Sequence, residues 1–204
     1  IVPPMQDDKY IKEISKVVEV ENIDLILPTG PDVEPISKNA HLFEGKLFMS
    51  DYESIMDCTD KWRFYNKCKD EFVRCEVLIM AAAVADIKPL KVYKSKMKKS
   101  MIKSTLEINS TIDILYELGK KKGSKIIIGF ALESINSVIN AEKKLKSKNL
   151  DGIVLNSLDN ENSCFGSETN KITFLNKKGE RNVYPTKDKK LVAKDILQHV
   201  KQML

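Results

Sequence analysis

The sequence predicts an α/β fold built on a doubly wound, mainly parallel sheet that ends in a β-hairpin and a closing helix. Short apolar runs occur at residues 77–80 (VLIM), 125–130 (KIIIGF) and 152–155 (GIVL). Between them lie longer stretches in which apolar residues recur at helical spacing. Strands that alternate with helices are typical of parallel sheets with helical crossovers, and continuous apolar runs are typical of strands buried on both faces.

The first 70 residues predict the order helix, strand, helix, strand, helix. The first helix rests on the helical spacing of Ile11, Ile14, Val17 and Val18. Pro28-Thr29-Gly30-Pro31 ends the first strand, and Ser50 or Asp51 is the expected cap of the last helix. The expected bounds are 8–21 and 32–43 for the first two helices, Ile23–Leu27 and Lys46–Met49 for the strands, and about 51–67 for the last helix.

The remaining residues complete the predicted sheet and its covering helices. A half-exposed strand is expected at Leu106–Ile108, and two helices at about 111–122 and 136–148. A hairpin is expected from residues 171–175 and 182–184, around Asn176-Lys177-Lys178-Gly179. The closing helix is expected over 187–203, with its apolar face formed by Leu191, Val192, Ile196, Leu197 and Val200.

Composition excludes several classes of protein. The chain of 204 residues is 42% hydrophobic with a net charge of +5, which allows a real core and one or two domains. Aromatic residues make up 7% and do not alternate with the basic residues, so we expect no nucleic-acid partner. No apolar run approaches the roughly 18 residues of a membrane span, and the start has neither a signal pattern nor a methionine. We therefore expect a trimmed piece of a cytoplasmic protein that does not bind membranes.

The four cysteines have no C-x-x-C spacing and no nearby histidine. We therefore expect reduced thiols and neither a metal site nor a disulfide framework. The standard phosphate-binding loops, G-x-x-x-x-G-K-[ST] and G-x-G-x-x-G, are also absent from the sequence.

The clearest candidate site follows the strand at 77–80. Met80 is followed by small residues, including Ala81 and Ala82, and then by Asp86 and a lysine-rich stretch. Ligands of open α/β sheets bind beyond the carboxyl ends of the strands, where a carboxylate can accept hydrogen bonds from sugar hydroxyls and lysines can meet phosphates. Phe130, at the end of another predicted strand, could stack on a base. The alternatives are a solvated basic loop and a core aromatic residue.

Lysines supply candidate phosphate contacts. Lys144 and Lys148 are four residues apart and so share one face of the predicted helix, where they could clamp a triphosphate. Lys96 lies in an extended segment that could close over the site and stabilise negative charge on a transferring group. Solvated surface lysines are the alternative in both cases.

Six stretches together resemble phosphopantothenate–cysteine ligase, an enzyme of coenzyme A synthesis, over about residues 70–204. They occur in the family's order with compatible spacing. The stretches are AAAVADIKP (81–89), KMKK (96–99), TIDIL (111–115), GFALE (129–133), AEKKLKSKNLDGIVLN (141–156) and FGSETNKI (165–172).

The resemblance implies a Rossmann-like, homodimeric ligase that uses CTP or ATP with Mg²⁺. An acyl-nucleotide of phosphopantothenate forms, pyrophosphate leaves, and the amine of cysteine attacks. Lys96 would be the catalytic lysine of the flap, and Lys144 and Lys148 would bind the phosphates of the nucleotide. The other nucleotide-binding positions would be Met80, Ala81, Ala82, Asp86, Ile112, Asp113, Ile114, Leu115 and Phe130.

The first third departs from that family, whose Asn-x-Ser-Ser-Gly stretch has no match in these residues. Residues 7–67 instead resemble the domain that precedes the catalytic core of ATP-grasp ligases. We therefore expect two parts, an α/β segment at 1–69 and a nucleotide-binding, ligase-like domain at 70–204, sharing one continuous sheet.

Three functions remain open at this stage. The first is an active ligase, the second a nucleotide-binding scaffold without turnover, and the third a chimeric α/β protein without a ligand. The sequence does not choose between CTP and ATP.

Overall fold

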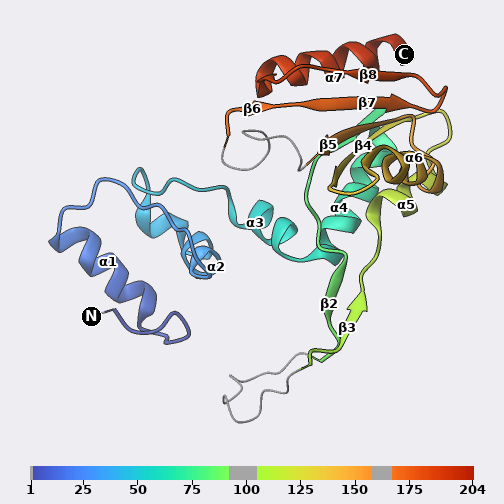
Figure 1. Cartoon of the computed structure of the whole chain (residues 1–204). Coiled ribbons are helices and arrows are strands. Elements are labelled where there is room, and N and C mark those ends of the chain that lie inside the picture. Colours follow the sequence, from blue (N-terminus) through green and yellow to red (C-terminus); the bar gives the residue numbers. More distant parts are fainter. Residues whose placement is uncertain (1, 92–104, 158–166) are drawn as a thin grey trace. The chain divides into compact units, whose positions relative to one another are not determined.

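The computed structural model describes residues 2–91, 105–157 and 167–204, and the chain divides into two compact units, Ile1–Lys67 and Cys68–Leu204 (Figure 1). The candidate site residues all belong to the second unit. Among the described residues, every helix is too short or too polar to cross a membrane.

The first unit is mainly helical. Its helices are α1 (Tyr10–Val20), α2 (Val33–Lys38), the 3₁₀ turn η1 (Ala40–Phe43) and α3 (Tyr52–Thr59), and α4 (Lys61–Arg74) begins in it. The helix expected at 8–21 is thus confirmed as α1. A small core forms where these elements meet, from the buried side chains of Tyr10, Val18, Ile36 and Phe43.

Two expectations for the first unit are wrong. The strands expected at 23–27 and 46–49 are reduced to one parallel bridge, between Ile26 and Leu47. The long helix that follows is broken at Asp60, whose extended backbone separates α3 from α4. Asp51 caps α3 as expected, because its carboxylate accepts a hydrogen bond from the Ser54 N–H at 2.9 Å.

The second unit is built on a five-stranded sheet with the order β1-β4-β5-β7-β8. β1, β4 and β5 are parallel, and the hairpin of β7 and β8 joins them in antiparallel sense, which confirms the predicted fold class. None of the strands of this sheet comes from the described residues of 1–69, where one shared sheet was expected. The strands are β1 (Val77–Met80), β4 (Ile126–Glu133), β5 (Gly152–Ser157), β7 (Ile172–Asn176) and β8 (Arg181–Val183).

Short strand pairs flank this sheet. The antiparallel pair of β2 (Ile87–Pro89) and β3 (Ile108–Ser110) forms an arm, and β6 (Thr169–Asn170) pairs with β9 (Lys187–Asp188). Figure 1 shows the arm extending from the end of β1.

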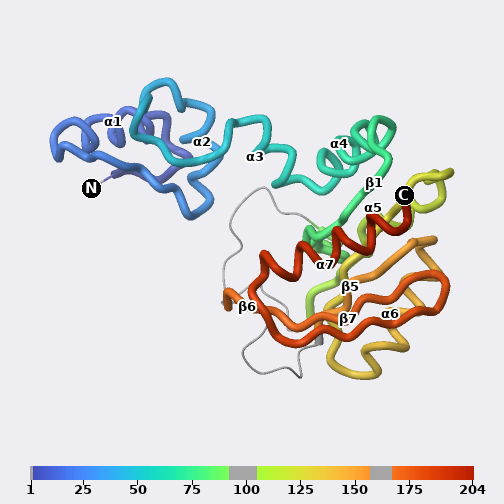
Figure 2. The backbone as a smooth tube through the Cα atoms, turned by 90° about the horizontal axis from the view of Figure 1, so that it is seen from above, coloured from blue at the N-terminus to red at the C-terminus, as the bar shows by residue number. Residues whose placement is uncertain are grey.

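Helix α7 (Lys189–Met203) covers one face of the sheet (Figure 2). Val192, Ile196 and Val200 are buried in one cluster with strand residues such as Ile128 and Phe174. Burying each such side chain contributes about 1.5–3 kcal/mol. Leu191 and Leu197, expected on the same apolar face, are instead about half exposed. The buried residues of α7 are therefore spaced by four along the helix.

Helices α5 (Ile114–Lys120) and α6 (Ser137–Ser147) lie on the other side of the strands (Figure 1). Side chains alternate along a strand, so Gly129 faces away from α7. A Cβ atom at Gly129 would lie 3.0 Å from the Leu115 side chain of α5, which shows how closely helix and strand approach. β4 is therefore buried on both faces, as its apolar sequence predicts.

β1 is a different case, because it stands at the edge of the sheet. Its residues are intermediate or exposed, and Ile79 is 37% exposed. The expectation that this strand is buried on both faces is therefore wrong. A short apolar run cannot by itself tell a central strand from an edge strand.

A buried carboxylate joins three loops at the amino-terminal edge of the sheet. Asp151, just before β5, accepts hydrogen bonds from the Ile127 N–H at 2.9 Å and from Lys122 Nζ at 2.7 Å, and pairs with Lys177 Nζ at 2.5 Å. Burial alone would raise the pKa of the Asp151 carboxyl, but these hydrogen bonds outweigh it and hold the pKa below its usual value. The carboxylate therefore stabilises the folded state as a charged group.

Replacing this carboxylate by an amide tests that role. Asp151→Asn leaves the Lys122 ammonium buried without a counter-charge, so we expect the free energy of unfolding to fall by about 3 kcal/mol in urea denaturation. The exposed substitution Asp70→Asn should change it by less than about 0.5 kcal/mol.

The same variant predicts a pH dependence. Because the folded pKa of Asp151 is depressed, its contribution is fully present above the unfolded pKa of about 4 and is lost as the pH falls through the folded value. The difference in stability between the wild-type protein and Asp151→Asn should thus shrink below about pH 4. A constant difference from neutral to strongly acidic pH would contradict this role.

Candidate functional site

The candidate site lies at the carboxyl edge of the parallel strands. β1 ends at Met80, which pairs with Gly129 of β4, and the chain then leaves the sheet. Ala81 and Ala82 are exposed, as is Asp86. The small side chains therefore leave the backbone accessible at the end of β1, as the sequence predicts for a nucleotide that lies against it.

Thr111 fastens this loop to the segment before α5. Its N–H donates to the carbonyl of Asp86 at 2.9 Å, and its hydroxyl donates to the carbonyl of Ala85 at 2.7 Å. These bonds bring residues 81–86 beside residues 112–115, as a shared site requires. Sequence reasoning did not identify Thr111 as the residue that joins the two segments.

The segment 112–115 combines helix capping with a charged contact. Asp113 caps α5 by accepting a hydrogen bond from the Tyr116 N–H at 3.0 Å. Its other carboxylate oxygen pairs with Lys148 Nζ at 2.8 Å. Ile114 and Leu115 are buried and hold α5 against the sheet, whereas Ile112 is 38% exposed. In this segment Ile112 and Asp113 are therefore the residues available to a ligand.

Lys144 makes a second ion pair at this edge. Its ammonium lies 2.6 Å from Oε1 of Glu133, the last residue of β4, and the Glu133 side chain is only 14% exposed. The other carboxylate oxygen of Glu133 accepts a hydrogen bond from the Asn140 amide at 3.3 Å. Sequence reasoning noted Glu133 only as part of the stretch after the strand and missed its role as the partner of Lys144.

Each of the two candidate phosphate-binding lysines is thus balanced by a carboxylate. Both pairs are partly exposed, and such pairs contribute only about 0–1 kcal/mol each. A polyanion that approached α6 would compete with Glu133 and Asp113 for the same ammonium groups. The arrangement can therefore exchange a weak internal partner for a strongly charged ligand.

Phe130 lies within β4, as the predicted strand 125–130 requires. The strand is longer than predicted and continues to Glu133, so Phe130 is not its last residue. Its half-buried ring packs on the cluster formed with α7, on the face opposite α5 and α6. Its role in binding a base stays a prediction. Lys96 lies outside the described residues.

A pair of asparagines completes the edge at the end of β5. Asn170 is buried, and its amide donates to Oδ1 of Asn156 at 3.1 Å, while its own Oδ1 accepts from the Lys171 N–H at 2.9 Å. The sequence placed Asn156 at this strand end but gave no signal for Asn170. The pair fixes the chain where β6 meets β7.

Gly119 sets the distance between α5 and the end of α6. A Cβ atom at this position would lie 2.0 Å from the carbonyl oxygen of Lys148. Asn149, which follows in the left-handed region with φ of 53°, also donates from its side chain to the Gly119 carbonyl at 2.9 Å. This close approach brings the Lys148 side chain within reach of Asp113.

Comparison with known families shows which family the chain belongs to. The family model of the DNA/pantothenate metabolism flavoprotein C-terminal domain (DFP) matches residues 42–204. The chain belongs to the DFP family. The match confirms the expected kinship with coenzyme A synthesis enzymes, and it begins well before residue 70. The expected resemblance of residues 7–67 to the domain that precedes an ATP-grasp core stays a prediction.

Curated relatives of this DFP chain are longer proteins. It is 42% identical over 125 residues, 61% of this chain, to the coenzyme A biosynthesis bifunctional protein CoaBC of Bacillus subtilis. It is 35% identical over 173 residues, 83% of this chain, to CoaBC of Borreliella burgdorferi. It is also 42% identical over 132 residues, 64% of this chain, to a protein named cysteine/cysteine sulfinic acid decarboxylase from an unknown prokaryotic organism. The chain spans only 31%, 40% and 37% of these relatives, respectively.

Solved structures share the fold of this DFP chain. The C-terminal domain of a CoaBC protein superposes with a TM-score of 0.56 at 28% identity, over 78% of this chain and 65% of that one. Cab2, solved as its H337A mutant in complex with phosphopantothenate-cysteine, gives a TM-score of 0.51 at 17% identity, over 84% and 61% of the two chains. At that identity the second likeness concerns the fold alone.

The close contact at Gly119 predicts that Gly119→Ala destabilises the protein, the opposite of what helix propensity predicts. Helix propensity alone would favour Gly119→Ala by about 1 kcal/mol. Because the new methyl group would overlap the Lys148 carbonyl, we expect destabilisation of about 3 kcal/mol in urea denaturation. Lys121→Ala, at the exposed end of α5, should have little effect. An increase in stability for Gly119→Ala would refute the close packing of α5 against the end of α6.

Proposed function

We propose that this DFP chain is a nucleotide-dependent ligase domain that joins phosphopantothenate to cysteine in coenzyme A synthesis. A carboxylate activated by CTP or ATP forms an acyl-nucleotide, pyrophosphate leaves, and the cysteine amine attacks. Membership of the DFP family supports the pathway, and the CoaBC relatives are named for coenzyme A biosynthesis. The protein would act in the cytoplasm.

One structural observation carries the proposal. The two hydrogen bonds of Thr111 hold the Asp86 loop against the segment that contains Asp113, and Asp113 pairs with Lys148, which follows α6. The candidate sugar-binding and phosphate-binding groups lie along one edge of the sheet, although Asp86 and Lys148 are 62 positions apart in the sequence. This proximity supports a site for a nucleoside triphosphate.

The residues take distinct roles in this proposal. Met80, Ala81 and Ala82 leave room for the nucleotide against the backbone, and Asp86 accepts hydrogen bonds from the ribose hydroxyls. The triphosphate replaces Glu133 and Asp113 as the partner of Lys144 and Lys148. Ile112 and Phe130 border the base, and Lys96 stabilises the negative charge that builds on the transferred group.

Mg²⁺ accompanies the nucleotide in this scheme. Among the described residues, His, Cys, Asp and Glu side chains form no group of three that could hold an ion without help. Mg²⁺ commonly binds through one or two carboxylates together with substrate phosphates. The described residues therefore fit an ion carried chiefly by the triphosphate, whose charge it would neutralise.

A homodimer is part of the proposal. The arm of β2 and β3 exposes four large apolar side chains, Ile87, Leu90, Leu106 and Ile108, each about half exposed or more. A two-stranded ribbon is marginal by itself, and clustered apolar exposure marks an interaction surface. We expect a second copy to cover the arm, so that Ile108→Lys lowers the molar mass measured by light scattering from that of a dimer to that of a monomer.

Nucleotide binding without turnover is the second candidate. It is favoured by the lack of an Asn-x-Ser-Ser-Gly stretch in these 204 residues, since that stretch supplies an asparagine used in catalysis by the family that the sequence resembles. Binding and turnover experiments separate the two candidates.

Opposite effects of two substitutions test the nucleotide site. Lys144→Gln removes a phosphate contact, so we expect the affinity for CTP or ATP to fall about tenfold in calorimetric titration. Glu133→Gln removes the internal competitor of that contact and should tighten binding several-fold. Lys194→Gln, an exposed lysine on α7, serves as the control. Unchanged affinity in both site variants would place the triphosphate elsewhere.

Turnover is tested by pyrophosphate release. We expect release only when nucleotide, phosphopantothenate, cysteine and Mg²⁺ are all present, and a loss of at least about a hundredfold in Lys96→Ala, because transition-state charge loses its partner. Lys99→Ala, which removes another lysine of the same basic stretch, is the matched control. Release at background level in wild type and Lys96→Ala alike, with nucleotide binding intact, would support the scaffold and refute the ligase.

A further inference from the structure

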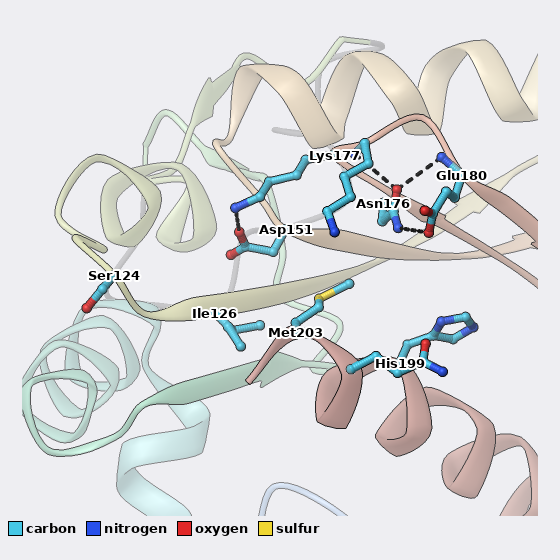
Figure 3. Close-up of a pocket in the computed structure, with 10 residues that line it drawn as sticks. Ser124, Ile126, Asp151, Asn176, Lys177, Glu180, His199 and Met203 are labelled. Atoms are coloured by element: carbon cyan, nitrogen blue, oxygen red, sulfur yellow. Dashed lines mark hydrogen bonds and ion pairs between the residues drawn. The ribbon is translucent and has the colours of Figure 1, made fainter.

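A cavity lies at the amino-terminal edge of the sheet (Figure 3), opposite the edge that carries the proposed nucleotide site. It encloses about 450 Å³, within the usual range for small-molecule sites. It is bordered by Ile126, the first residue of β4, and by Asp151, which precedes β5, so it lies where the parallel strands begin. The turn between β7 and β8 and the last two turns of α7 form its other walls.

The side chain of Asn176 fixes the conformation of the turn between β7 and β8. Oδ1 of Asn176 accepts hydrogen bonds from the N–H groups of Lys178 and Glu180, both at 3.0 Å, and its amide donates to the Glu180 carboxylate at 2.6 Å. Gly179 has φ of +86°, which the turn requires. Lys177 is tied to Asp151, as described above. The wall therefore exists before any ligand binds.

The α7 wall is fixed as well. His199 stacks on Phe174 with ring centroids 4.0 Å apart and an angle of 4° between the planes. One of its ring nitrogens lies 2.6 Å from the Tyr184 hydroxyl. Burial lowers the pKa of His199, despite the opposing influence of Asp195 and Glu180, so the ring is neutral at pH 7.

The charges around the cavity leave one cation uncompensated. Lys122 and Lys177 both face the Asp151 carboxylate, and Lys178 and Glu180 stand in the turn. His199 is neutral. The ammonium groups of these residues thus outnumber the carboxylates by one.

Unused polar groups also line this cavity. Within the described residues, the side chains of Lys178, Gln202 and Ser124 have no hydrogen bond or ion pair. All three can donate hydrogen bonds. Ile126 and Met203 add apolar surface beside them. Hydrogen-bond donors beside apolar groups suit a ligand with an anionic head and an apolar or flat body.

We propose that this cavity is a binding site for a small organic anion, a carboxylate or phosphate monoester, with Lys178 and Gln202 holding the oxyanion. The proposal is independent of the ligase assignment, because the site shares no residue with the nucleotide edge. Its position at the start of β4 and β5 separates it from the chemistry at their ends.

Titration of the full chain with benzoate and with phenyl phosphate, followed by ¹H–¹⁵N spectra, tests the site. We expect saturable shifts at Asn176–Glu180 and Gln202, with a dissociation constant of about 1 mM or below. Benzyl alcohol, which lacks the charge, should give no saturable shift. The anion that binds more tightly identifies the head group as carboxylate or phosphate.

Matched lysine variants provide the control. Lys178→Gln should weaken binding about tenfold, since it removes a charge-assisted hydrogen bond, while Lys194→Gln should leave it unchanged. Both side chains are exposed, so the spectra far from the cavity verify that each variant is folded. Shifts absent at about 10 mM anion, equal for benzyl alcohol, or equal in the two variants would overturn the proposal.

Discussion

The parallel pairing of β4 with β1 and β5 is the constraint on which the rest of the second unit depends. Ile127 and Ile128 at the centre of β4 are fully buried, one on each face, so helices must cover both sides. Parallel pairing also places the ends of all three strands at one edge. The loops that leave those ends therefore lie close together, although no motif in the loops themselves predicts it. Ligands of such sheets bind at this edge.

Electrostatics at the two edges differ in kind. At the amino-terminal edge, Asp151 is buried and bound by several partners, so its charge stabilises the folded state. At the carboxyl edge, Lys144 and Lys148 are partly exposed, and each has a single carboxylate partner. Pairs of that kind are weak and exchangeable. Charge thus holds loops together at one edge, whereas the other edge carries weak, partly exposed ion pairs.

The sequence predicted much of the second unit and less of the first. The predicted positions of β1, β4, the hairpin and α7 match the structure. In strongly patterned segments, only one type of secondary structure buries the apolar residues together. The strand expected at 23–27 and the continuous helix to residue 67 failed because short or polar segments take their structure from their surroundings. Among the candidate site residues, Asp86, Asp113 and Lys148 could be proposed from spacing and resemblance. Thr111 and Asn170 could not, because a lone hydroxyl or amide has no periodic signal.

By itself, the sequence determined the fold class, the order of the central elements and the family, since each depends on local pattern or on stretches in a fixed order. Only the tertiary structure decided that β1 is an edge strand, that Phe130 packs toward α7, and that Glu133 and Asp113 already occupy the lysines of α6. The reason is physical. Strand position, face and ion pairing are set by contacts between residues far apart in the chain, and those contacts exist only once the sheet has formed.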